Sequence, residues 1–189
     1  AALDDLIVNT NAGYAVYDFN KVYHAVYNFC VVDMSNFYLD IIKDRLYCDE
    51  TDGLARRSAQ TALYLILDTI TKIMAPILCF TGDEIWLAMP HKAGDDDRNV
   101  LFNDMNGVFA DYALSADEMA KWEKIIEVRD AVNGALETAR AEKKIGKSLE
   151  ADVHLTVPAE DAFLANVDGK ELADLLIVSQ VEVTVGDSV

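Results

Sequence analysis

The chain has 189 residues, of which 52% are hydrophobic and 26% charged, a composition typical of a folded globular protein and not of a disordered or coiled-coil chain. Its formal net charge of −17 would repel nucleic acid if the charge were spread evenly. The longest apolar run, residues 73–80, is far shorter than the roughly 20 residues of a membrane span. The N-terminus has no signal-peptide pattern, so we expect a cytoplasmic protein without membrane contact.

Helical patterns follow one another through the first half of the chain. Residues 3–17 carry a weak pattern without an N-cap, which suggests that the chain begins inside a longer protein. Asp18 can cap a stronger helix, in which apolar residues recur at three- and four-residue steps. A second such pattern covers residues 34–46, and Asp33 and Ser35 could cap a restart or a kink between the two.

The clearest helix is predicted for residues 55–74, where apolar residues alternate at four- and three-residue steps and Pro76 ends the pattern. The sequence Thr-Gly-Asp-Glu at residues 81–84 has the form of a capping box and predicts a short helix that reaches Met89. Residues 90–114 form a long connection, which predicts either a packed excursion or a functional arm.

A second capping box at residues 115–118 predicts a helix of some 25 residues, which we expect Gly146 to end. Residues 151–157 then alternate between apolar and polar side chains, the pattern of a strand with one buried face. Two short helices and a β-rich run complete the chain at residues 161–167, 170–175 and 177–185. The predicted fold is mainly α, a helical bundle with a small C-terminal α/β extension, in domains 1–115 and 116–189.

No group of residues in the sequence assembles an active site. The cysteines and histidines lack the spacings of a metal site or of a nucleophile with its base, and packing is favoured for Cys30 and Cys79. A half-buried, hydrogen-bonded position is favoured for His24. The aspartates at 95–97 could hold a hard cation, but a solvated charge run is favoured. Gly-Lys-Ser at 146–148 lacks the earlier glycine of a phosphate-binding loop. We expect no catalysis, cofactor or metal in this chain.

Basic residues are concentrated in two groupings. Residues 1–120 carry a net charge of −11 and residues 148–189 one of −8, whereas residues 121–147 carry +2. The first grouping flanks a polar turn at 48–53 and contains Lys43, Arg45, Arg56 and Arg57. The second runs along the long helix and its end and contains Lys121, Lys124, Arg129, Arg140, Lys143, Lys144 and Lys147. These residues could contact RNA phosphates, which position RNA without specifying sequence. A solvated helix face with ion pairs three or four residues apart is the open alternative.

Two adjoining motifs give a family resemblance. They are DFNKVYHAVYNFC at residues 18–30 and DMSNFYLDIIKDRLY at residues 33–47, and they resemble the anticodon-binding helical domain of isoleucyl-tRNA synthetases. Further motifs occur in the family's order at residues 56–61, 74–78, 81–86 and 142–151. The related valyl and leucyl enzymes share the proline break and the Asp-Glu-Ile-Trp-like helix, whereas the two long motifs look like the isoleucyl type.

The resemblance implies a class I synthetase anticodon-binding module with tRNA for isoleucine as its partner. A parent synthetase would activate isoleucine with ATP and Mg²⁺ and transfer it to the tRNA. The family's ATP-binding signatures, editing domain and zinc-binding cysteine cluster are absent here, so we expect a fragment whose other partners are the remaining domains of the parent. A structural or protein-interaction domain without RNA contact is the alternative.

The candidate RNA contacts are seven of the basic residues. On the bundle they are Lys43, Arg45, Arg56 and Arg57, and at the junction after it they are Lys143, Lys144 and Lys147. Three polar residues inside the matched motifs, Asn28, Asp33 and Asp40, are expected to be buried polar anchors of the bundle, because a helical core must satisfy each such group.

Overall fold

The computed structural model describes residues 1–186 and divides the chain into two compact units, Ala1–Ala113 and Leu114–Val189. The division lies two residues before the predicted domain boundary. The first unit is a helical bundle and the second contains a small parallel sheet, so the predicted fold class, mainly α with a small α/β extension, is confirmed. Within the described residues, no helix is both long and apolar enough to cross a membrane.

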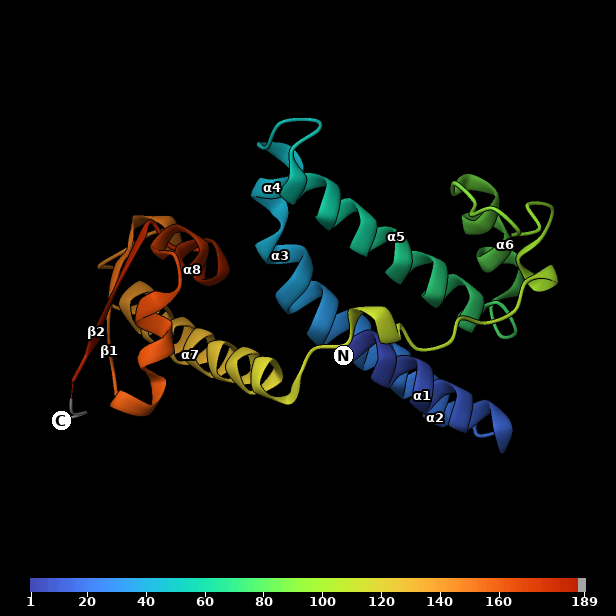
Figure 1. Cartoon of the computed structure of the whole chain (residues 1–189), viewed down its shortest axis with the longest axis horizontal. Coiled ribbons are helices and arrows are strands. Elements are labelled where there is room, and N and C mark those ends of the chain that lie inside the picture. Colours follow the sequence, from blue (N-terminus) through green and yellow to red (C-terminus); the bar gives the residue numbers. More distant parts are fainter. Residues whose placement is uncertain (187–189) are drawn as a thin grey trace. The chain divides into compact units, whose positions relative to one another are not determined.

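The first unit consists of helices and one long connection (Figure 1). Its α-helices are α1 (Ala2–Ala15), α2 (Phe19–Asn28), α3 (Leu39–Ile41), α4 (Lys43–Tyr47), α5 (Leu54–Met74) and α6 (Cys79–Ala88). A π-helix, η1 (Phe29–Tyr38), joins α2 to α3, and two 3₁₀ turns, η2 (Val100–Phe102) and η3 (Ala110–Tyr112), lie in the connection. The predicted end of α5 at Met74, just before Pro76, is confirmed.

The start of α2 follows the prediction, but its continuation does not. Asp18 accepts a hydrogen bond from the Lys21 backbone N–H at 3.0 Å and caps the helix. Neither Asp33 nor Ser35 restarts a helix, because the backbone passes from α2 into η1 and on to α3 in helical conformation. A π-helix has wider turns than an α-helix. The change from one to the other explains why the apolar pattern shifts near residues 33–35, where the sequence predicted a restart or a kink.

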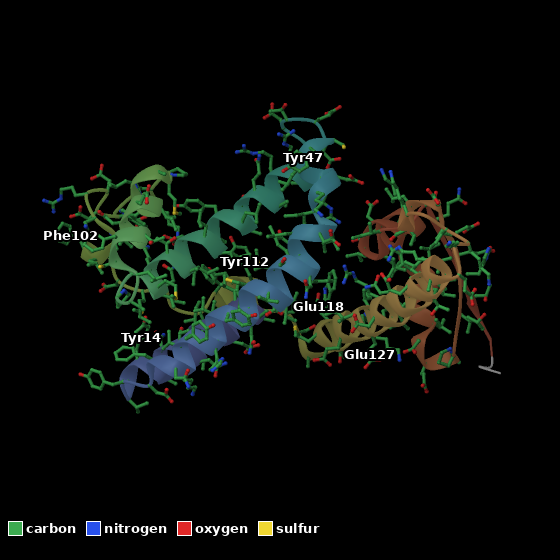
Figure 2. All side chains as sticks on the ribbon, turned by 180° about the vertical axis from the view of Figure 1, so that it is seen from behind. Tyr14, Tyr47, Phe102, Tyr112, Glu118 and Glu127 are labelled. Atoms are coloured by element: carbon green, nitrogen blue, oxygen red, sulfur yellow. The ribbon has the colours of Figure 1, made fainter. Side chains whose placement is uncertain are left out.

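Apolar side chains of α1, α2 and α5 form the core of the first unit. Its fully buried members include Leu6, Ile7, Val22 and Ile73. Gly13 makes the α1–α2 contact possible, because a Cβ there would lie 2.8 Å from Cγ2 of Val22. The hydroxyl of Tyr14 (labelled in Figure 2) donates a hydrogen bond to the carbonyl of Ile73 at 2.7 Å and links α1 to α5.

The capping box predicted for α6 is wrong. The helix begins at Cys79 without a side-chain cap, and residues 81–84 lie inside it. The backbone N–H of Gly82 already donates to the carbonyl of Leu78 at 2.8 Å, so the helix starts two residues before the box. The carboxylate of Asp83 instead accepts the backbone N–H of Val100 at 3.3 Å, which fixes part of the long connection.

The connection at residues 90–114 is a packed excursion. Trp86 of α6 is 1% exposed and donates its indole N–H to the carbonyl of Asp96 at 3.1 Å. Further along, the backbone N–H of Phe109 donates to the carboxylate of Asp4 in α1 at 2.7 Å. The connection is therefore anchored both to α6 and to the first turn of α1, which explains how a loop of this length belongs to a compact unit.

A buried carboxylate holds this connection to α5. Asp68 is fully buried, and its oxygens lie 3.0 Å from Nζ of Lys72 and 2.6 Å from Nζ of Lys92. The side-chain amide of Asn106 donates to the same carboxylate at 2.8 Å. Burial raises the pKa of Asp68, but the hydrogen bonds from Lys92, Asn106 and Lys72 outweigh it and hold the pKa below its ordinary value.

The second unit packs a long helix against a β-α-β arrangement. Its elements are α7 (Ala116–Ala141), η4 (Ser148–Glu150), β1 (Asp152–Val157), η5 (Ala159–Asn166), α8 (Gly169–Leu176) and β2 (Gln180–Val185). Strands β1 and β2 are parallel, with Val153 opposite Val181. The buried core contains Val132 and Leu136 of α7 and Leu172 and Leu176 of α8.

The predicted start of α7 is confirmed and its predicted end is wrong. Ser115 forms the reciprocal capping box with Glu118, which is labelled in Figure 2, and the Ser115 backbone N–H donates to the Glu118 carboxylate at 2.9 Å. The helix ends at Ala141 and not at Gly146, because Lys143 takes the left-handed backbone conformation that ends it.

Replacement of Asp68 tests the importance of this buried carboxylate. Asp68→Ala leaves the buried Lys72 ammonium without its closest partner, so we expect a loss of about 3 kcal/mol in the free energy of unfolding. The measurement is urea denaturation followed by circular dichroism. Asp104→Ala, at an exposed aspartate of the same connection, is the control and should stay within about 0.5 kcal/mol. Equal effects of the two variants would contradict the assignment.

The depressed pKa of Asp68 also predicts the acid sensitivity of the first unit. Because the folded state binds this proton less readily than the unfolded state, Asp68 stabilises the fold above its ordinary pKa of 3.8 and loses this contribution as pH falls through the lower folded value. Urea midpoints between pH 7 and pH 3 should converge for the parent protein and Asp68→Asn as the pH falls. A constant difference across this range would exclude the proposed linkage.

Candidate nucleic-acid interface

The first basic grouping lies at the end of the first unit where α4 meets α5. Lys43 and Arg45 belong to α4, and Arg56 and Arg57 lie in the first turn of α5, on the other side of the turn at residues 48–53. The fold therefore brings all four residues to one end of α5. Tyr47, the last residue of α4, marks this end in Figure 2.

Acceptors nearby already bind two of these four basic side chains, Lys43 and Arg56. Lys43 forms an exposed ion pair with Asp40 at 2.7 Å, and this hydrogen bond raises the pKa of Lys43. Nη1 of Arg56 donates to the carbonyl of Asp49 at 3.0 Å, which ties the turn to α5. Residues 40–57 carry four basic and five acidic side chains, so this surface is electrostatically mixed rather than strongly cationic.

Features of this end that sequence reasoning missed favour contact with an anion or a base. The N-cap of helix α5 is Gly53, which has no side chain to cap it, and the first turn has no acidic residue, so the free N–H groups add to the positive potential of the two arginines. The Nε atom of Arg56 is buried without a hydrogen-bond partner in the described structure. Tyr47 is 82% exposed, and an exposed aromatic ring can stack on an unpaired base.

The second basic grouping surrounds the C-terminus of α7. The N–H of Lys143 donates to the carbonyl of Arg140 and that of Lys144 to the carbonyl of Ala139, both at 2.9 Å, which together form a Schellman motif. Lys143 has φ of 58° at the position where this motif favours glycine. A non-glycine residue in this conformation costs roughly 1–2 kcal/mol.

A tight turn follows the motif and is organised by Glu150. Its carboxylate accepts the backbone N–H of Gly146 at 2.8 Å, and backbone hydrogen bonds from Gly146 and Lys147 lower the pKa of Glu150. Arg140 contacts both Glu137 and the hydroxyl of Ser148, which joins the helix to the far side of the turn. The turn is therefore fixed by side chains at both ends.

Two further basic residues of α7, Arg129 and Lys124, are engaged within the second unit. Arg129 is 8% exposed and donates from Nε to the carbonyl of Leu175 at 3.1 Å, so it holds the core of the second unit and is not a surface cation. Lys124 pairs with Glu127 at 3.2 Å and with Asp161 at 3.1 Å. Lys124 therefore fits the alternative of a helix face with ion pairs, whereas the buried Arg129 fits neither interpretation.

The expected buried anchors are wrong in part. Asn28 is exposed, and Asp33 and Asp40 are half-buried. Burial raises the pKa of Asp33, and Asp40 accepts the hydrogen bond from Lys43 at the surface. Asp33 lies within η1, whose wider turns shift its side chain away from the direction that an α-helix would give it.

Other sequence expectations also need correction. His24 is exposed and contacts the ring of Tyr23, where a half-buried position was expected, and Cys79, for which packing was expected, is exposed as well. The aspartates at 95–97 are not a uniformly solvated run, because Asp95 lies 3.6 Å from Lys72 and hydrogen bonds from Arg98 lower the pKa of Asp96 to about 2. No cluster of three or more His, Cys, Asp or Glu side chains within residues 1–186 could hold a metal ion.

Comparison with known proteins points to one family. Residues 1–155 match the family described as "Anticodon-binding domain of tRNA ligase". The chain is 47% identical over 183 residues to an isoleucine–tRNA ligase of Syntrophotalea carbinolica, covering 96% of this chain and 19% of that protein. The corresponding enzymes of Caldicellulosiruptor saccharolyticus and Coxiella burnetii are 44% and 46% identical, covering 97% and 90% of this chain. The chain spans about a fifth of the length of these relatives.

Proposed function

Because this chain belongs to the family of anticodon-binding domains of tRNA ligases, we propose that it binds the anticodon arm of a tRNA for isoleucine. The observation that carries the proposal is the extent of the family match, residues 1–155, which includes the whole first unit, α7 and the turn after it. Both basic groupings therefore lie inside the matched region. The names of the similar ligases supply isoleucine as the expected amino acid.

The physical contribution of such a module is orientation. A tRNA held by its anticodon arm presents its other end at a defined place, so that a reaction far from the contact gains from reduced freedom of the bound RNA. No residue of this chain needs to touch the reacting atoms. We propose that amino-acid activation with ATP and Mg²⁺, and aminoacyl transfer, belong to other parts of a full-length ligase.

Zinc has no step in this proposal. The described residues offer no cluster of ligands that fits zinc, so the proposal assigns no zinc site to this chain. The role of the chain is to bind RNA through local surfaces, against the repulsion that its net charge of −17 creates. This repulsion makes weak, strongly salt-dependent binding the expected behaviour of the isolated chain.

The contacts proposed on the bundle combine phosphate and base recognition. Arg56 and Arg57 supply guanidinium groups beside the uncapped start of α5, which suits a backbone phosphate. Lys43 and Arg45 lie on the neighbouring helix and add charge. Tyr47 supplies an exposed ring for an unstacked base of the anticodon loop, the part of a tRNA in which bases are free to stack on protein side chains.

Footprinting and salt titration test the proposed function. We expect the protein to protect the anticodon arm of an isoleucine tRNA transcript from nuclease, and the observed affinity to fall with salt by nearly one unit of log–log slope for each phosphate contact. Absence of protection at low ionic strength, or protection spread evenly over the tRNA, would contradict the proposal. A tRNA with a different anticodon loop is the specificity control.

Charge reversal separates RNA contact from a purely structural role. Arg56→Glu with Arg57→Glu should weaken tRNA binding by about tenfold or more, because it replaces two phosphate contacts by two repulsive charges. The matched control is Lys21→Glu with Lys170→Glu, which changes the net charge equally at two exposed lysines outside both groupings. Equal affinities of the two double variants would favour the alternative, a helical domain without direct RNA contact at this end.

A further inference from the structure

We propose that the turn at residues 143–150 is a preorganised phosphate-binding turn, in which Lys143 contacts the RNA backbone and Glu150 is a positioning residue. The inference rests on the proposed function and deepens it by assigning separate roles within the second basic grouping. Its ligand is a backbone phosphate of the bound tRNA. The argument depends on the backbone conformation of Lys143, the charges around it and the contacts of Glu150.

The backbone conformation at residue 143 favours glycine over lysine. The Schellman motif places this position in the left-handed region, where glycine is the usual residue. Two other non-glycine residues have positive φ in the described structure, of which Ile177 is packed whereas Tyr17 is 81% exposed. Ile177 is half-buried between the core residues Leu176 and Val178, and the ring of Tyr17 lies edge-on to Phe19. Lys143 is exposed and gains no comparable packing.

The charges around the turn leave a local positive excess. From 140 to 150 the chain has four basic and two acidic residues. Both acids are engaged, since Glu142 pairs with Lys144 at 2.6 Å and Glu150 accepts backbone N–H groups. Lys143 and Lys147 form no ion pair among the described residues. They are the two exposed cations of this turn that remain available to an anion.

Glu150 fixes the direction in which these cations are presented. Its carboxylate accepts the backbone N–H of Gly146 at 2.8 Å, which holds the turn against the side chain of Glu150. The backbone and the positive charge of Lys147 also lower the pKa of this carboxyl. A negative charge in an RNA-binding turn opposes RNA by simple electrostatics, so its presence is explained by its hold on the backbone.

Three variants of Lys143 separate RNA contact from a role at the helix end. Lys143→Gly removes the charge and relieves the backbone, Lys143→Gln removes the charge alone, and Lys143→Arg keeps the charge. We expect Gly and Gln to weaken tRNA binding by about fivefold and to lower the salt slope by about one unit, whereas Arg binds like the parent protein. The thermal midpoint of Lys143→Gly should not fall by more than about 2 °C.

The outcomes are distinct. If Lys143 serves only to complement the helix dipole, Lys143→Gln and Lys143→Gly change stability and leave the affinity and the salt slope unchanged, which overturns the inference. Lys170→Gln, at an exposed lysine of α8 outside both basic groupings, is the control for loss of one positive charge. If the parent protein itself does not bind the tRNA, the proposed function fails, and the inference fails with it.

Glu150→Ala tests the positioning role by the sign of its effect. Loss of a negative charge beside two lysines should tighten RNA binding if electrostatics alone governs the turn. If Glu150 positions the turn, Glu150→Ala weakens RNA binding by about threefold or more, although it removes a negative charge. The double variant Lys143→Gly with Glu150→Ala should have a thermal midpoint close to that of Glu150→Ala alone. Tighter binding by Glu150→Ala would overturn the assignment of Glu150.

Discussion

One buried negative charge governs the architecture of the first unit. The carboxylate of Asp68 on α5 is fully buried, and such a group is tolerated only where donors surround it. One donor, Lys72, lies one turn further along the same helix, but Lys92 and Asn106 come from the connection between α6 and η3. The connection must therefore return to α5 to complete the site, which gives a loop of 25 residues a defined path.

The sequence predicted the elements that depend on local patterns. The Asp18 cap, the Ser115 capping box, the proline that ends α5 and the alternation of β1 all act within a few residues, and the structure contains each of them. The errors have non-local or competing causes. The capping box predicted at residues 81–84 does not form, because the helix already begins at Cys79. Gly146 does not end α7, because Lys143 takes the left-handed conformation before it. The Asp68 network joins residues far apart in the chain, so no local pattern could reveal it.

The candidate site follows the same division. The positions of the lysines and arginines along the sequence located both basic groupings, because clustering of charge is visible there. It could not distinguish exposed cations from structural ones: Arg129 looks like its neighbours in the sequence, yet it is buried against the carbonyl of Leu175. Nor could it separate Tyr47 from the aromatic residues of the core, since the exposure of a side chain at the last position of a helix depends on what packs beside it.

The π-helix between α2 and α3 has a geometric consequence for this surface. An α-helix turns its side chains by about 100° for each residue, whereas the wider turns of η1 rotate them less. Over Phe29–Tyr38 the accumulated lag sets the direction in which the side chains of α3 point, and Ile42 (φ −91°, ψ 0°) then interrupts the helix before α4, which carries Lys43 and Tyr47. The number of residues in η1 thus acts as an angular adjustment: inserting or deleting one would rotate α3, and the start of α4 that follows it, about the helix axis.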